Sequence, residues 1–389
     1  MYCPLITRVL LLSPVSGHDI AGGDVAFTEA LLARPPEGVT YTTYIDALAD
    51  GTLVERGRRP KHGAIRARDA FIFCARGIEL ALRRTGLLFR EPYRYLTVDP
   101  DAFDLMHSHV FSLRLIGTDL PLVMSAGFPL SVLYEDRFHW SHRRVLFATW
   151  MEHLLARTFG VQVPWFPPRT AALSLVQSDH YRNSLIEAGA DPQRVLVRTL
   201  AIDGVASEPR PGPPRTIGFI STDFEGKGGR VVVDAFRSLL TTHPDARLVV
   251  VGTDSLPPDL ILPDGSVEWL GRVSRSEVLE SVFPRIDVLV HPTRCDSGPP
   301  FVILEALQRS IPVITSDLVW IDEGLTGDGV RRVPVDTEHV SLAMADLFDA
   351  DTYEDASRAA VALWESRYSM DVLAGHLGDD YNVALRPLA

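Results

Sequence analysis

Short runs of β-branched and other apolar residues alternate with longer stretches of helical periodicity along most of this sequence. In the first half the predicted strands are Arg8–Ser13, Thr40–Tyr44, Leu105–Met106, Leu122–Ser125, Leu173–Gln177 and Val195–Arg198. In the second half they are Ile217–Ile220, Arg247–Val251, Val267–Leu270, Val288–His291, Ile311–Thr315 and Val330–Val333. This alternation is typical of parallel α/β sheets, in which a helix connects each strand to the next.

The length of the chain, 389 residues, exceeds what one hydrophobic core usually supports and fits two domains. Residues 207–215 are dense in proline and suit neither a helix nor a strand, so they are predicted to link the two halves.

Composition excludes several classes of protein. A net charge of -12 disfavours a nucleic-acid binder. Cys3, Cys74 and Cys295 are far apart and form no CxxC pair, which argues against a disulfide framework or structural zinc and favours a reducing cytosol. No apolar run approaches the ~20 residues that span a bilayer. We therefore expect a cytoplasmic protein that is at most peripheral to the inner face of a membrane.

Positive charge is unevenly distributed. Residues Arg56–Arg94 contain ten arginines and one lysine against three acidic residues, a local charge of +8 that leaves −20 elsewhere. Within it, Ala70–Arg84 reads as a helix with Arg76, Glu79 and Arg83 on one stripe. Two interpretations stay open: this helix covers the first sheet with a solvated edge, or the basic stretch contacts anionic lipid or a phosphorylated acceptor.

Lysine is scarce: Lys61 and Lys227 are the only lysines among the 38 lysines and arginines. Lys227 lies in the Gly-rich segment 218–230, between a predicted strand and the helix Val231–Leu240. Free N–H groups and the dipole at a helix start favour a diphosphate, and a lysine adds a mobile positive charge. We predict that Lys227 binds phosphate; a solvated lysine in a Gly-rich connection is the alternative.

A second motif covers Asp296–Asp317. A turn leads into Phe301–Leu307, which is apolar on every side except at Glu305, and Ile311–Thr315 follows as a buried strand. A helix that is apolar all round is buried, and a carboxylate inside it is costly without a partner. Glu305 is therefore predicted to have a specific partner near the edge of a sheet.

This turn–helix–strand unit resembles the C-terminal signature of retaining nucleotide-sugar glycosyltransferases of family 4. There, two glutamates eight positions apart flank a Gly-containing turn, and the second holds the donor ribose. Glu305 matches the second glutamate and Gly298 the glycine, whereas Ser297 stands in the place of the first glutamate. The segment around Lys227 resembles the phosphate-binding Lys-Gly element of the family.

The resemblance implies the GT-B fold, an α/β architecture of two Rossmann-like parallel-sheet domains facing a cleft. It also implies transfer of a sugar with retention of anomeric configuration. The expected divisions are an acceptor-side domain (1–206), the linker (207–215), a donor-binding domain (216–370) and a C-terminal helix (371–389) that returns to the first domain. The expected co-substrate is a nucleotide sugar of unknown base, with no tightly bound cofactor and no metal, and the acceptor is a glycan, a lipid or a small molecule.

The resemblance also implies catalytic roles for Lys227 and Glu305 and a set of donor contacts. These contacts are Gly22, Gly23, Gly271, Val273, Ser297, Gly298, Pro299, Pro300 and Phe301. The dinucleotide fingerprint GxGxxG is absent, which disfavours NAD and FAD.

Three histidines are candidates for the acceptor or sugar side: His18, which follows the first strand, and His107 and His109, at the end of a later one. A cap for His18 and packing for the other two are the alternatives. No third ligand follows at metal-binding spacing, so a metal is not expected.

The sequence departs from the family pattern at two further positions. Thr222 replaces an arginine, for which Arg230, Arg272 and Arg294 are the candidate substitutes. Ala126 replaces a histidine near the transferred sugar. With Ser297, these departures leave two alternatives to transfer: a non-catalytic glycosyltransferase-like binding protein, or a GT-B sugar-nucleotide epimerase.

Overall fold

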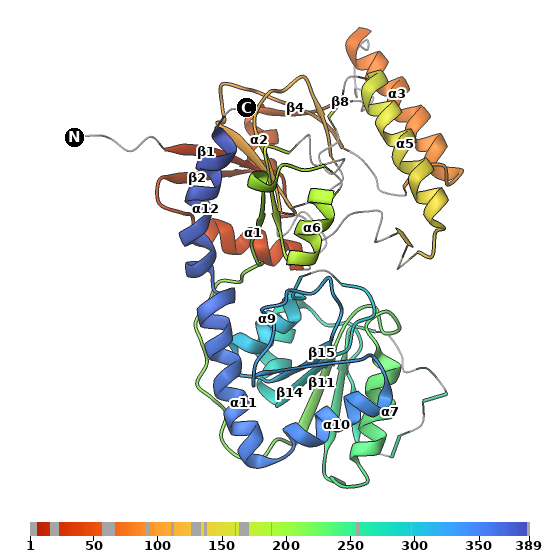
Figure 1. The fold of residues 1–389 in the computed structure, drawn as a ribbon, viewed down its shortest axis with the longest axis vertical. Coiled ribbons are helices and arrows are strands. Elements are labelled where there is room, and N and C mark those ends of the chain that lie inside the picture. Colours follow the sequence, from red (N-terminus) through yellow and green to blue (C-terminus); the bar gives the residue numbers. More distant parts are fainter. Residues whose placement is uncertain are drawn as a thin grey trace, which may run out of the picture.

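The structure is a computed structural model, and Figure 1 shows its fold. It describes residues 6–15, 23–56, 67–89, 94–109, 113–125, 134–135, 138–159, 161–162, 171–187, 189–253, 257, 259–260, 262–263, 265–296 and 298–386. His18, Gly22, Ala126 and Ser297, which the sequence singled out, lie outside the described residues.

The first sheet is entirely parallel, with the strand order β10-β9-β7-β5-β1-β2. Its strands are β1 (Thr7–Leu11), β2 (Val39–Thr43), β5 (Leu105–Ser108), β7 (Leu122–Met124), β9 (Leu173–Val176) and β10 (Val195–Val197). Most of these residues are buried because helices cover the sheet, as parallel sheets require.

The second sheet is also parallel, with the order β13-β12-β11-β14-β15-β16. Its strands are β11 (Thr216–Ile220), β12 (Arg247–Val251), β13 (Val267–Trp269), β14 (Val288–His291), β15 (Val313–Ser316) and β16 (Val330–Val333). All the predicted strands appear in these two sheets, and the predicted fold class is confirmed.

Helices connect and cover the strands (Figure 1). In the first half they are α1 (Gly23–Ala33), α2 (Tyr44–Asp50), α6 (Asp179–Glu187) and the turn η2 (Pro192–Arg194). In the second half they are α7 (Gly229–Leu239), α8 (Arg275–Glu277), η3 (Val278–Val282), η4 (Phe283–Arg285), α9 (Phe301–Gln308), α10 (Thr337–Leu347), α11 (Ala350–Leu363), η5 (Trp364–Tyr368) and α12 (Met370–Leu385). Aspartates cap α10 and α11, where the Asp336 and Asp349 side chains accept from backbone N–H groups of the first turn.

A third, mixed sheet with the order β3-β4-β6-β8 was not anticipated. Its strands are β3 (Leu53–Arg56), β4 (Arg94–Val98), β6 (Leu113–Ile116) and β8 (Val161–Gln162). Helices α3 (Ala67–Arg84) and α5 (His142–Phe159) accompany it. The expectation that Arg76, Glu79 and Arg83 on α3 form a solvated edge is wrong for Glu79 and Arg83, because both side chains are buried, whereas the Arg76 side chain is 29% exposed.

In both parallel sheets the strand order reverses beside the first strand. The reversal lies between β1 and β5 in the first sheet and between β11 and β14 in the second. At such a point the connections leave the carboxyl ends of two neighbouring strands in opposite directions, and the crevice between them is the usual ligand site of an open α/β sheet.

The chain passes between the halves twice. Ile202 and Ser369 form an isolated parallel bridge where the two crossings meet, and the Ile202 N–H donates to the Tyr368 carbonyl at 3.1 Å. Beyond this point α12 packs against α1 and against β5, β7 and β9. Across the described parts of the chain, no helix combines the length and the apolar character needed to span a membrane.

Candidate functional site

The loop between β11 and α7 is pressed against the loop that follows β14. Gly228, just before α7, has φ 75°, which favours glycine. A Cβ added there would lie 2.3 Å from the carbonyl oxygen of Pro292, so a larger residue would force the two loops apart. The Arg294 N–H also donates to the Gly226 carbonyl at 2.9 Å. The two loops at the switch point of the second sheet therefore form one surface.

Lys227 lies in this surface and extends towards the loop after β14. Its Nζ donates to the carbonyl of Cys295 at 3.2 Å and forms an ion pair with the carboxylate of Asp296. Asp296 was not among the residues singled out from the sequence. The signal that could have found it is a carboxylate directly before Ser297, one position before the expected glutamate.

His291, the last residue of β14, is the third charged or polar group here. Its Nε2 lies 3.9 Å from the Asp296 carboxylate, and neither ring nitrogen has a hydrogen-bond partner among the described residues. Burial lowers the pKa of His291 below its ordinary value. Burial raises the pKa of Asp296, but His291 and the Lys227 charge outweigh it and hold that pKa below its usual range. At neutral pH the centre thus consists of an ammonium, a carboxylate and a neutral imidazole.

Glu305 lies on α9 and is buried, with 8% of its surface exposed. Its carboxylate accepts a hydrogen bond from Arg275 Nη2 at 2.6 Å. Burial raises the pKa of Glu305 above its ordinary value, although the charges of Arg275 and Arg309 oppose the rise. The predicted partner for a buried carboxylate therefore exists and is Arg275, which the sequence analysis did not single out.

A pocket of about 260 Å³ adjoins this pair. Glu305, Arg275 and Arg309 line it from the second half, and Ala26 and Ala30 of α1 line it from the first. Small residues on α1 leave the room for it. Glu29 and Asp203 also line it, so the pocket offers two guanidinium groups and three carboxylates to a ligand between the two halves.

The loop Gly271–Val273 leads directly to Arg275. Gly271 has φ 68°, and its carbonyl accepts from the Gly252 N–H at 2.7 Å, which joins the loops after β12 and β13. Ser274 then caps α8, where its hydroxyl accepts from the Glu277 N–H at 3.2 Å. The loop Gly271–Val273, which is predicted to contact the donor, is thereby connected through Arg275 to Glu305, the predicted ribose-binding residue.

The turn before α9 contacts the first half of the chain. Gly298 has φ 63°, and a Cβ there would lie 1.5 Å from Oε1 of Gln177, which directly follows β9. The Gln177 side chain is buried, and its amide oxygen and nitrogen have no hydrogen-bond partner within the described part of the chain. Gln177, which sequence analysis did not select as a site residue, thus presents two unsatisfied polar atoms beside this turn.

Pro299 is buried, and Pro300 lies at the N-cap of α9, where its missing N–H is not needed for the helix. Phe301 begins α9, and its ring centroid lies 6.5 Å from that of Phe27 on α1. The turn is therefore held between the two halves.

His109 lies at the switch point of the first sheet, beside the start of α1. Its Nδ1 is 3.0 Å from the Ser125 hydroxyl, and its Nε2 is 3.2 Å from the carboxylate of Asp24. Asp24 directly follows Gly23, the first residue of α1. His109 and Gly23 are thus close to one another, on the side of the first half that meets α9 through Phe27.

His107 has a different environment. Its Nδ1 pairs with the Tyr381 hydroxyl of α12 at 2.8 Å and its Nε2 with the Ser125 hydroxyl at 2.9 Å. Burial, together with His109, lowers the pKa of His107 to about 3. Both ring nitrogens are satisfied inside the protein, so His107 joins α12 to the first sheet.

The remaining candidates are peripheral. Thr222 is exposed, and Arg230 pairs with the exposed carboxylates of Glu225 and Asp259. Arg272 is exposed, whereas the backbone of Arg294 adjoins the Lys227 loop. Among the described residues, no cluster of three or more His, Cys, Asp or Glu side chains could hold a metal ion.

Comparisons with known proteins agree with this architecture. Residues 214–349 match the family model of glycosyl transferases group 1. A search among curated proteins found no match. The crystal structure of Anabaena HepE in complex with UDP and glucose aligns over 97% of this chain and 99% of its own, with 13% identity and a TM-score of 0.58. A glycosyltransferase from Rickettsia africae aligns over 98% and 99%, with 12% identity and a TM-score of 0.55. The chain therefore has the GT-B fold of these glycosyltransferases, and its second sheet lies within a segment that matches glycosyl transferases group 1.

Proposed function

We propose that this protein is a glycosyltransferase that moves a sugar from a nucleotide-sugar donor to a glycan, lipid or small-molecule acceptor, with retention of anomeric configuration. The observation that carries the proposal is the position of Lys227. Lysine is the rarest charged residue type in this sequence, and Lys227 lies at the switch point of the second sheet, at the start of α7 and against the loop after β14.

In this proposal the donor lies along the carboxyl end of the second sheet. Lys227 and the N–H groups at the start of α7 bind the diphosphate. Glu305, oriented by Arg275, accepts hydrogen bonds from the ribose hydroxyls. Gly271 and Val273 meet the base through backbone groups, and Gly298, Pro299, Pro300 and Phe301, with Ser297, surround the sugar and phosphate.

Asp296 gives the site a carboxylate despite the serine at position 297. We assign to it the orientation of Lys227, because the ammonium is held by Asp296 and by the Cys295 carbonyl. An incoming diphosphate carries more negative charge than one carboxylate and competes for the same ammonium. As the bond to the sugar breaks, charge grows on the leaving phosphate, and Lys227 stabilises that charge. The departing diphosphate takes the proton of the acceptor hydroxyl.

The acceptor is placed on the side of the first half. His109 and Gly23 lie at the switch point of that half, and Gln177 presents unsatisfied amide atoms next to Gly298. The proposed division of the chain is unchanged: 1–206, 207–215, 216–370 and 371–389. It is supported by the two parallel sheets, each built from strands on one side of residues 207–215.

The linker itself is fixed to the second half in this conformation. The Ser207 N–H donates to the Gln308 carbonyl at 2.9 Å, and Arg210 Nη2 donates to the Phe283 carbonyl at 3.0 Å. Any closing movement of the two halves is therefore expected around the bridge of Ile202 and Ser369, before the linker starts.

The test is a thermal-shift panel of UDP, GDP, ADP and dTDP sugars on the purified protein, beginning with UDP-glucose. A matching donor raises the unfolding temperature because it binds the folded state alone. The control pair is Lys227→Met against Arg230→Met, which removes an exposed arginine three residues away. The shift should fall with Lys227→Met and persist with Arg230→Met.

Turnover of the matching donor separates the proposal from its alternatives. A non-catalytic binding protein would be stabilised by a nucleotide sugar but would release no nucleoside diphosphate with any acceptor mixture. An epimerase would convert the sugar without an acceptor. Proton NMR of the transferred sugar then reads its anomeric configuration, and an inverted product would contradict retention.

A further inference from the structure

Helices α3 and α5 run side by side at the upper right of Figure 1. Both helices expose large apolar side chains. Phe73, Ile78, Leu80, Leu146, Phe147 and Trp150 are between 44% and 56% exposed. On α5, Leu146 and Trp150 are one helical turn apart, and the ring centroids of Phe147 and Trp150 are 6.0 Å apart. Exposed apolar residues that gather on two adjoining helices are typical of an interaction surface.

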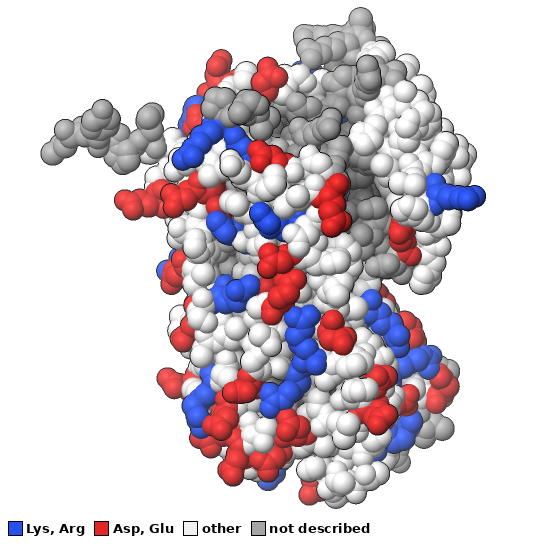
Figure 2. All heavy atoms as spheres, viewed as in Figure 1, with Lys and Arg blue, Asp and Glu red and all other residues white. Residues whose placement is uncertain are grey.

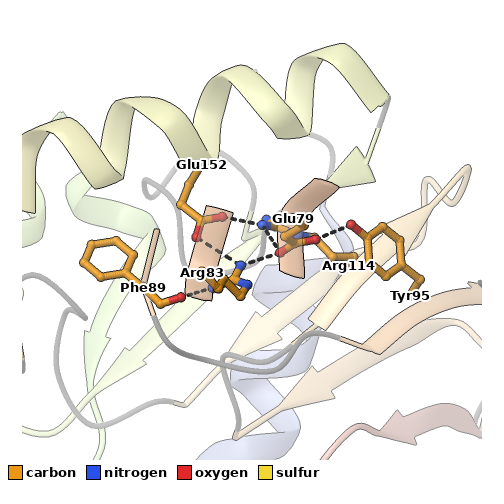
Figure 3. Close-up of polar contacts among 6 residues, drawn as sticks. All are labelled: Glu79, Arg83, Phe89, Tyr95, Arg114 and Glu152. Carbon is orange, nitrogen blue, oxygen red and sulfur yellow. Dashed lines mark hydrogen bonds and ion pairs between the residues drawn. The ribbon is translucent and has the colours of Figure 1, made fainter. Parts of the chain in front are cut away.

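The cause of this exposure is an ionic network on the inner side of the same helices (Figure 3). Glu79 and Arg83 of α3, Glu152 of α5 and Arg114 of β6 point towards one another, and each side chain is at most 9% exposed. Arg114 Nη2 donates to Glu79 at 3.0 Å, and Arg83 Nη2 donates to Glu152 at 3.1 Å. Two carboxylates and two guanidinium groups thus neutralise each other inside.

The helix pair is therefore inverted relative to an ordinary surface helix, whose charged face is outside. Turning α5 around its axis would expose Glu152 and leave two buried arginines with one carboxylate, and turning α3 would break the pairs of Glu79 with Arg114 and of Arg83 with Glu152. A buried charge without full compensation costs several kcal/mol. The inner network thus fixes which face is outside, and the apolar outer face is a stable property of the fold.

The exposed charges that the structure describes on these two helices are positive. Among the side chains described on α3 and α5, the acidic ones are Glu79 and Glu152, and both are buried. Arg84 and Arg143 are exposed on the same two helices. Figure 2 shows the surface of this region as mostly uncharged, whereas the lower part of the molecule carries many acidic groups.

We propose that the outer face of α3 and α5 docks onto an anionic lipid bilayer. A bilayer interface offers what this face lacks: an apolar layer for the aromatic and aliphatic side chains, and anionic headgroups for Arg84 and Arg143. Trp150 suits the boundary between headgroups and acyl chains, where its ring is half apolar and half polar.

A second copy of the chain fits this face less well. Symmetric pairing through α3 and α5 would bring together two surfaces on which the exposed charges, among the side chains described on these helices, are arginines without a balancing carboxylate. Charge complementarity therefore selects the bilayer. With a net charge of -12, the rest of the chain is repelled by an anionic membrane, so contact is confined to this face.

The test is flotation of the full-length protein with phosphatidylcholine vesicles, with and without phosphatidylglycerol. We expect binding to the anionic vesicles at low salt and release at high salt, because screening weakens the arginine contacts. The emission of Trp150, identified as the part lost in Trp150→Phe, should shift to shorter wavelength on binding. The variant Ile78→Gln/Leu146→Gln/Phe147→Gln/Trp150→Gln should lose at least about tenfold in vesicle affinity.

Two controls keep the result interpretable. Leu342→Gln removes a leucine of α10 that is 63% exposed and should leave vesicle binding unchanged. Circular dichroism should show the quadruple variant folded, since all four side chains are exposed. Indifference of the folded wild type to anionic vesicles at low salt overturns the proposal. So does sedimentation showing that the quadruple variant converts a dimer into a monomer, because the face would then bind a second copy.

Discussion

The ammonium of Lys227 contacts the carboxylate of Asp296, which follows the neighbouring strand of the second sheet. The lysine is therefore paired within the protein, at the place where α7 begins. A ligand that takes this lysine must compete with Asp296. This ion pair joins two residues that are 69 positions apart in the sequence.

Replacing Asp296 by Asn should tighten nucleoside diphosphate binding by roughly three- to tenfold, because a negative charge beside the phosphate site is removed while the shape is kept. Calorimetric titration with the diphosphate of the matching donor measures this. Asp234→Asn, which neutralises an exposed carboxylate of α7 that pairs with Arg237, is the control and should leave affinity unchanged. Weaker binding in Asp296→Asn would mean that the carboxylate assists the donor.

Glu305→Gln should weaken donor binding by about ten- to a hundredfold, since the loss of a charged hydrogen bond costs roughly 1.5–3 kcal/mol. Arg275 would at the same time lose the carboxylate that it contacts at 2.6 Å. The dissociation constant of the donor is the measurement, and the exposed Glu280→Gln serves as the control. If Glu305→Gln binds donor as the wild type does, the ribose does not lie on α9.

Glu152→Gln should lower the free energy of unfolding by about 3 kcal/mol, because breaking a buried ion pair leaves an uncompensated charge. Its carboxylate, which is 0% exposed, contacts Arg83 and Arg114. Urea denaturation measures the loss. Glu354→Gln, which removes an exposed partner of Arg358, should change stability by less than about 0.5 kcal/mol. Equal effects of the two variants would contradict the importance of the inner network.

His107 should make the protein less stable in acid. Its folded pKa of about 3 lies below the ordinary value of 6.5, so between these values the unfolded chain binds more protons than the folded one. Stability therefore falls as pH decreases from about 6.5 towards 3, by up to about 1.4 kcal/mol per pH unit for this residue. Denaturation at several pH values should show a flatter dependence for His107→Gln. Parallel curves for the two proteins would show that His107 does not titrate in this way.

The two parallel sheets were predictable from the sequence. Strands such as Arg247–Val251 and Val288–His291 are short, apolar and regularly spaced, and burial on both faces of a parallel sheet produces that local pattern. The prominence of Lys227 and Glu305 was also readable, because one is a rare residue type here and the other is a single charge in an apolar helix. Their roles in donor binding remain predictions.

The local sequence pattern did not predict the burial of charged side chains whose ion-pair partners are distant in the sequence. Arg114 lies in the short strand β6, and its charge suggests solvent, yet it is buried because Glu79 and Glu152, which are 35 and 38 residues away, neutralise it. The same long-range ion pairs hold the charged faces of α3 and α5 inside and leave their apolar faces exposed.

The contacts of Asp296 with Lys227 and of Gln177 with Gly298 likewise exist only once strands and halves meet. Periodicity in a sequence reports which residues share a face. The tertiary structure alone decides what that face meets, because the energy of a buried charge depends on its partners.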